Sequence, residues 1–110
     1  MGASLLEYHV LLALASGALH GYAIAERVAA ESSGALRPRA GSLYRVIARL
    51  IGAGLVVERE AEVEAPHPGL ARRYYTLTAA GRRTLAEEAR HLKQVAAAAE
   101  KRLGLARGRS

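Results

Sequence analysis

Arginine supplies most of the chemistry that this sequence can offer. Among 110 residues, 16 are Lys or Arg and 10 are Asp or Glu, so the net charge is +6. A guanidinium group presents a planar fork of N–H donors that matches a phosphate or the O6/N7 edge of guanine. Ser42, Arg45 and Arg49 are spaced by three and four residues, which places them on one face of a helix. This pattern indicates a surface that binds an anion.

The residues between these arginines are apolar. In a helical projection of AGSLYRVIARLIG, residues 40–52, the apolar side chains fill one broad sector and Tyr44 lies on its flank. The segment therefore predicts a helix that docks one face into a core and presents Ser42, Arg45 and Arg49 on the other. On this helix alone, an ordinary solvated surface remains the simpler alternative.

Basic residues elsewhere favour a nucleic-acid duplex as the anion. Arg37 and Arg39 directly precede the helix, where the positive end of the helix dipole favours phosphate. Arg72 and Arg73 begin a strand beside Tyr74. A helix for the major groove and a basic hairpin for the adjacent backbone would form one footprint. The other strand of the hairpin is acidic, and we expect its glutamates to face away from phosphate: Glu58, Glu60, Glu62 and Glu64.

Helix caps and turn residues delimit the elements that position these groups. Ser4 and Glu7 have the spacing of a capping box, Thr78 is a second N-cap, and Gly17, Gly34 and Gly54 are expected to end helices. Pro and Gly at 66–69 separate two strand-like segments. Helices are expected at residues 4–15, 22–32, 40–52 and 79–103, and strands at 55–63 and 72–77.

This order of elements predicts a mainly α winged helix-turn-helix with a small two-stranded β-hairpin and a long C-terminal helix. We assign residues 1–78 to the winged-helix domain, 79–104 to a C-terminal dimerisation helix, and 105–110 to a disordered basic tail. The last helix would be roughly 37 Å long, more than so small a core can cover. Its apolar positions alternate by three and four residues, the spacing of a heptad seam, at Leu85, Ala89, Leu92, Ala96, Ala99 and Leu103.

This seam is short and half alanine, so packing on its own domain is the alternative to dimerisation. We expect a homodimer, because a chain of this size buries only about two-thirds of its unfolded surface and gains stability from a partner.

Composition excludes several other classes of function. The chain has no Cys, so disulfides and thiolate chemistry are absent and a reducing cytoplasm is the expected location. It also has no Asp or Asn, which removes most calcium and magnesium sites. We expect no metal and no cofactor, because no metal-ligand spacing relates His9, His20, His67 and His91.

His20-Gly21-Tyr22 has no partner for catalysis at a recognisable spacing, so we expect local packing, with Gly21 allowing the chain to turn into the second helix. The chain is not expected to be an enzyme. The apolar run at 10–15 is too short to span a bilayer.

Four motifs in order resemble the PadR family of bacterial transcriptional regulators. They are His20-Gly21-Tyr22, Gly41-Ser42-Leu43-Tyr44, Gly54-Leu55-Val56 after Leu50, and the run from Arg72 to Gly81, RRYYTLTAAG. The resemblance covers nearly the whole chain. It implies a dimeric winged helix-turn-helix repressor whose third helix enters the major groove, whose wing contacts the backbone or minor groove, and whose C-terminal helix dimerises. It also implies small hydrophobic effectors, often phenolic or multidrug-like.

Carried over by position, the resemblance places Tyr22, Ser42, Tyr44 and Arg49 at the DNA face and Arg72 and Arg73 in the wing. The chain departs from the family's usual pattern at three positions of the third helix, where it has Arg45, Ala48 and Ile51.

Our hypothesis is a homodimer on a palindromic operator. Because no Asn or Asp is present and Gln94 lies on the last helix, arginine readout of G·C pairs is expected, with Arg45 and Arg49 as readers. The phosphate contacts would come from Arg37, Arg39, Tyr44, Arg72 and Arg73, and Tyr74 beside the last two is also expected to be a DNA-binding residue. This hypothesis requires Arg45 and Arg49 not to be tied to the chain's own carboxylates. The alternative functions are a winged-helix protein-interaction module without specific DNA binding, and a small-molecule binder.

Overall fold

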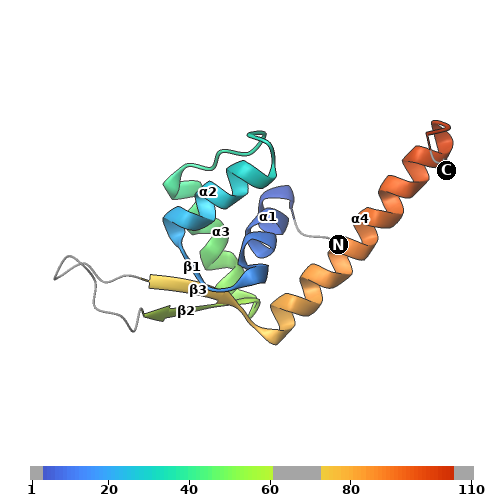
Figure 1. Cartoon of the computed structure of the whole chain (residues 1–110). Coiled ribbons are helices and arrows are strands. Elements are labelled where there is room, and N and C mark those ends of the chain that lie inside the picture. Colours follow the sequence, from blue (N-terminus) through green and yellow to red (C-terminus); the bar gives the residue numbers. More distant parts are fainter. Residues whose placement is uncertain (1–3, 61–72, 106–110) are drawn as a thin grey trace.

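The computed structural model describes residues 4–60 and 73–105. In chain order the elements are α1 (Leu5–Ala13), a 3₁₀ turn η1 (Leu14–Ser16), β1 (Leu19–His20), α2 (Gly21–Glu31), α3 (Ala40–Gly52), β2 (Val56–Glu60), β3 (Arg73–Leu77) and α4 (Ala79–Arg102) (Figure 1). The predicted turn at 66–69, the predicted strand residues 61–63, Glu62, Glu64, His67, Arg72 and the tail from 106 onward lie outside the described residues.

The predicted helix signals are confirmed. At the start of α1, Ser4 Oγ accepts from the Glu7 N–H at 3.2 Å and Glu7 Oε1 accepts from the Ser4 N–H at 3.1 Å, which is a capping box. Thr78 Oγ1 accepts from the Gly81 N–H at 2.9 Å at the start of α4. Beyond the ends of α2 and α3, Gly34 and Gly54 take φ values of 82° and 79°, the left-handed region that favours glycine.

The sheet differs from the predicted two-stranded hairpin. In the described residues it has three antiparallel strands in the order β1-β3-β2. β2 pairs with β3 as predicted, with Val56 opposite Leu77 and Glu60 opposite Arg73. The third strand, β1, is only Leu19 and His20. Two residues are too few to produce an alternating pattern, so only pairing with β3 reveals this strand.

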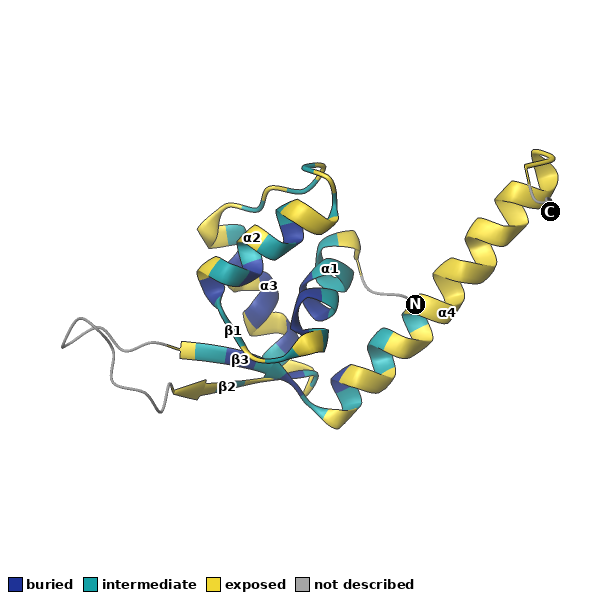
Figure 2. Ribbon diagram, in the orientation of Figure 1, coloured by how far each residue is buried: buried dark blue, intermediate teal, exposed yellow. Residues whose placement is uncertain are grey.

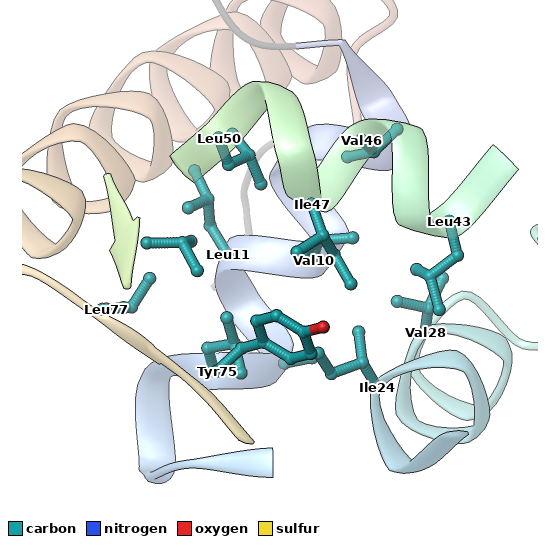
Figure 3. Packing of buried hydrophobic residues seen from close by; sticks show 13 residues of the cluster. Val10, Leu11, Ile24, Val28, Leu43, Val46, Ile47, Leu50, Tyr75 and Leu77 are labelled. Carbon is teal, nitrogen blue, oxygen red and sulfur yellow. The ribbon is translucent and has the colours of Figure 1, made fainter. Parts of the chain in front are cut away.

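The core lies where α1, α2 and α3 pack together against the sheet (Figures 1 and 3). The buried face of α3 is the apolar sector predicted from the sequence, and it consists of Leu43, Val46, Ile47 and Leu50. Burial of each such side chain stabilises the folded state by about 1.5–3 kcal/mol. These side chains meet Val10 and Leu11 of α1, Ile24 and Val28 of α2, and Tyr75 and Leu77 of β3. This packing fixes the rotation of α3, and hence which of its residues face outward.

The last helix, α4, leaves this core and projects into solvent (Figure 2). Its first turn is anchored, since Thr78 N–H donates to the Leu55 carbonyl at 3.0 Å and Thr78 Oγ1 donates to the Gly54 carbonyl at 2.7 Å. From Ala89 onward every described residue of the helix is exposed. Within the described residues, no helix is both long and apolar enough to cross a membrane.

Candidate nucleic-acid interface

The outward face of α3 carries Ser42, Tyr44, Arg45 and Arg49, and all but the half-buried Ser42 are exposed. The helix begins after Arg39, whose side chain makes no capping hydrogen bond. Among the described residues, no side chain accepts a hydrogen bond from the first-turn N–H groups. Arg37 and Arg39 precede them in the chain and are exposed, with the Arg37 guanidinium beside Gly34. Positive side chains next to uncapped backbone donors and the positive end of the helix dipole form a surface suited to phosphate.

Arg45 has little to hold it within its own chain. Its Nη2 donates to Ser42 Oγ at 3.5 Å, the long limit for a hydrogen bond. Among the described residues, no carboxylate pairs with Arg45. Within the described part of the chain, its guanidinium therefore has donors to offer an external acceptor.

Arg49 does not meet the same expectation. Its Nε donates to Glu7 Oε2 at 2.8 Å, so the prediction that both arginines avoid the chain's own carboxylates is wrong for Arg49. The cause is tertiary: α1 packs beside α3 and brings Glu7 next to Arg49. The Arg49 side chain nevertheless remains 64% exposed, whereas that of Glu7 is 18% exposed. Arg49 is anchored at its Nε and still faces solvent.

Tyr44 lies across the start of α2. A Cβ at Gly21 would be 2.1 Å from the Tyr44 hydroxyl oxygen, so any larger residue there would displace the Tyr44 ring from this position. This replaces the predicted reason for Gly21, because Gly21 lies inside α2 and does not have a positive φ. Tyr44 is 47% exposed. It therefore packs on the α2–α3 junction and still presents part of its ring to solvent.

An aromatic cluster joins the start of α2 to the sheet. The His20 ring lies parallel to that of Tyr22, with centroids 6.5 Å apart, and meets Tyr74 edge-on at 5.9 Å. His20 also caps α2, since its Nδ1 accepts from the Ala23 N–H at 3.3 Å. The local role predicted for His20 is thus confirmed. The sequence did not predict the contact with Tyr74, which depends on the pairing of β1 with β3.

The described part of the wing is less basic than predicted. Arg73 donates from Nη1 to Glu58, and this hydrogen bond together with the Glu58 charge raises the pKa of the Arg73 guanidinium above its ordinary value. The strand register places Glu58, Glu60 and Arg73 on the face of the sheet that also carries the buried Tyr75. Arg59 and Tyr74 share the opposite face. The glutamates of β2 therefore offset the positive charge of Arg73.

The predicted seam on α4 divides into two parts. Leu85 is half-buried and packs against the core of its own domain. The remaining members are exposed: Ala89, Leu92, Ala96, Ala99 and Leu103. Large apolar side chains are prominent along this part of α4, with Leu92 40%, Val95 51% and Leu103 71% exposed. Sequence reasoning omitted Val95, which lies beside the seam rather than on it.

A metal centre and a large ligand cavity have little support in the geometry. Among the described residues no group of three His, Cys, Asp or Glu side chains could hold a metal ion. A cavity of about 110 Å³ lies between the end of α1 and α2, lined by Ala13, Ser16, Gly17, Ala18, Leu19 and Arg27. Pockets for drug-sized ligands have volumes of roughly 300–1,000 Å³. This cavity is therefore too small for a ligand of that size.

Comparison with known proteins decides the family. The model of the transcriptional regulator PadR-like family matches residues 10–87, which include the end of α1, all of α2 and α3, the three strands and the start of α4. The chain belongs to the PadR family. No curated relative matches this PadR chain. Because the family consists of transcriptional regulators, the expectation that the chain is not an enzyme agrees with its membership.

Solved PadR structures share the fold. A PadR family regulator from Clostridium difficile is 18% identical with a TM-score of 0.76, covering 91% of this chain and 99% of that one. A PadR-like transcription factor from Bacteroides fragilis is 27% identical with a TM-score of 0.73, covering 88% of each chain. Bacillus subtilis PadR in complex with operator DNA is 25% identical with a TM-score of 0.64. The match covers 76% of this chain but only 45% of the B. subtilis protein.

Proposed function

We propose that this PadR-family regulator binds double-stranded DNA sequence-specifically as a homodimer and represses transcription from a palindromic operator. The observation that carries the proposal is the division of α3 into two faces. Leu43, Val46, Ile47 and Leu50 are buried in the core, so α3 cannot rotate. Its polar face, with Arg45 and Arg49, is thereby held toward solvent as a recognition helix requires.

Base readout and phosphate binding fall to different residues in this proposal. Arg45 and Arg49 would read guanine edges in the major groove. Arg49 would do so with Nη1 and Nη2, because its bond to Glu7 engages Nε and leaves the side chain 64% exposed. Arg37 and Arg39 would bind phosphate near the uncapped start of α3, with Tyr44 beside them. Tyr22 is 70% exposed next to His20 and Tyr74 and would contact the adjacent backbone. Arg72 and Arg73 would contact the DNA from the wing. Arg73 would break its hydrogen bond to Glu58 when it binds.

The exposed apolar stripe of α4 supports the homodimer. A helix of 24 residues that is exposed from Ala89 onward is stable in water only if tertiary or quaternary packing covers its apolar side. A second copy of the chain would bury Leu92, Val95 and Leu103, and the small side chains between them would allow close approach of two helices. Two-fold symmetry would then place two α3 helices one DNA turn, about 34 Å, apart.

A small hydrophobic effector that releases the operator is the remaining part of the proposal. The cavity of about 110 Å³ within one chain is too small for a drug-sized molecule. We propose instead an effector site between two protomers, along the exposed apolar side chains of α4.

Selection of bound sequences from a random duplex pool, at two salt concentrations, tests the function. We expect enrichment of a palindrome with G·C-containing half-sites. The slope of log K against log salt should change by about −0.9 for each phosphate contact. A pool that shows no enrichment, or affinity that does not depend on salt, would refute specific DNA binding. The alternative, a protein-interaction module, would then be favoured if a protein partner is recovered with the chain.

A further inference from the structure

The Glu7 carboxylate is engaged on both of its oxygens, at the edge of the proposed DNA face. Oε1 accepts from the Ser4 N–H at 3.1 Å and Oε2 accepts from Arg49 Nε at 2.8 Å. The Glu7 N–H in turn donates to Ser4 Oγ at 3.2 Å. With only 18% of its side chain exposed, Glu7 is held by the capping box of α1. It therefore offers Arg49 a fixed acceptor.

The pairing constrains Arg49 at one nitrogen. In the described residues Arg49 donates from Nε to Glu7, and no bond from Nη1 or Nη2 is present. A guanidinium is planar, so an anchor at Nε orients the whole group. Nη1 and Nη2 keep their donors, and the side chain is 64% exposed. In the same part of the chain, Arg45 has a single 3.5 Å bond to Ser42 and no such anchor.

We infer that Glu7 is a specificity-determining residue that acts by positioning Arg49 for base recognition. The inference rests on the proposed DNA binding by α3. An oriented arginine loses less side-chain entropy when it binds a base than a mobile one. The same carboxylate contributes a negative charge near the DNA, which weakens sequence-independent attraction to phosphate. Glu7 therefore raises the preference for the operator through both effects.

Glu7→Gln is the discriminating substitution. Glutamine can maintain the capping box with its oxygen on Ser4 N–H. Its NH2 group then replaces the oxygen that accepts from Arg49 Nε, so that a donor faces a donor. We expect operator affinity relative to random DNA to fall about tenfold, which is about 1.4 kcal/mol, with relaxed preference at one base pair per half-site. Affinity for random DNA should be unchanged or higher. In an Arg49→Ala background, Glu7→Gln should no longer relax the preference at that base pair, and only its effect on affinity for random DNA should remain.

Two controls separate positioning from a structural role. Ser4→Ala removes the other half of the capping box and leaves the Glu7–Arg49 pair. It should lower the melting temperature without changing the base preference of the folded protein. In the DNA-free protein, the Nε–H resonance of Arg49 should be shifted and protected from exchange, and Glu7→Gln should abolish both properties.

The outcomes distinguish this inference from the proposed function. If the wild-type chain selects an operator but Glu7→Gln lowers specific and random binding equally, or strengthens operator binding, the positioning role is refuted and DNA recognition stands. An unshifted Arg49 Nε–H in the wild-type chain refutes the pairing itself. If the wild-type chain selects no sequence, the proposed function fails and this inference fails with it.

Discussion

Gly81→Ala tests how α4 is attached to the winged-helix domain. A Cβ at Gly81 would lie 2.0 Å from the Leu55 carbonyl oxygen, whereas real Cβ contacts are essentially never below 3.0 Å. The obstacle is backbone, so the turn after α3 and the start of α4 must separate by about 1 Å. That movement disturbs the bonds from Thr78 N–H to Leu55 and from Thr78 Oγ1 to Gly54.

The strength of these two hydrogen bonds determines how much Gly81→Ala should lower the free energy of unfolding. Each is worth about 0.5–1.5 kcal/mol, and forcing an extra Cβ into a packed contact costs about 1–3 kcal/mol. The gain in helix propensity from glycine to alanine offsets about 1 kcal/mol at most. We therefore expect Gly81→Ala to lower the free energy of unfolding by about 2 kcal/mol. For a domain of this size that corresponds to a fall in melting temperature of about 8 °C.

Gly52→Ala is the matched control. Gly52 also lies in a helix, and a Cβ there would meet nothing within 4 Å. It should leave stability unchanged or raise it by up to about 1 kcal/mol. Denaturant unfolding followed by circular dichroism, at one fixed protein concentration because dimerisation adds stability, compares the two variants. Equal stabilities would show that α4 is not attached through this close contact.

Three other perturbations examine DNA reading, assembly and the core. Arg45→Ala should weaken operator binding by about 1–3 kcal/mol and relax one base position in a competition gel shift, whereas an equal loss on random DNA would contradict a reading role. Leu92→Arg should raise the dimer dissociation constant more than tenfold, as measured by sedimentation equilibrium, because it removes buried apolar surface and buries a charge in both copies. The control Ala97→Arg, on the opposite face of α4, should leave the dissociation constant unchanged. Burial raises the pKa of the Tyr75 hydroxyl, so its stabilising contribution is complete below the unfolded value of about 10 and is lost at higher pH. Tyr75→Phe should therefore lose less unfolding free energy than the parent between pH 9 and 11, and identical losses would refute this.

Most helices were predictable because their signals are local. The capping box at Ser4, the cap at Thr78 and the left-handed glycine at Gly54 lie within a few residues of the ends that they define. The buried and exposed faces of α3 also followed from its period, since an apolar sector must turn inward. The pairing of β2 with β3 was predicted from Pro and Gly at 66–69, which separate two strand-like segments. The three-stranded sheet was not, because β1 has only two residues.

The candidate interface was predictable by residue type but not by contact. The sequence identified α3 as the basic helix, and it could not show that Arg49 is anchored while Arg45 is not. Nor could it show that Glu58 forms an ion pair with Arg73. The alternation of β2 predicts which residues share a face of the sheet, but not which of them form an ion pair.

What the sequence by itself determined is where the helices begin and end, which face of each is apolar, and which residues carry the positive charge. These properties depend on neighbours within one or two helical turns. Only the tertiary structure decided the partners of those charges, the contact of Gly21 with Tyr44 and the need for glycine at 81. Glu7 and Arg49 are 42 residues apart in the chain, and Gly81 lies against the carbonyl of Leu55. Such contacts exist only after the helices have packed, since their geometry depends on the crossing of separate elements.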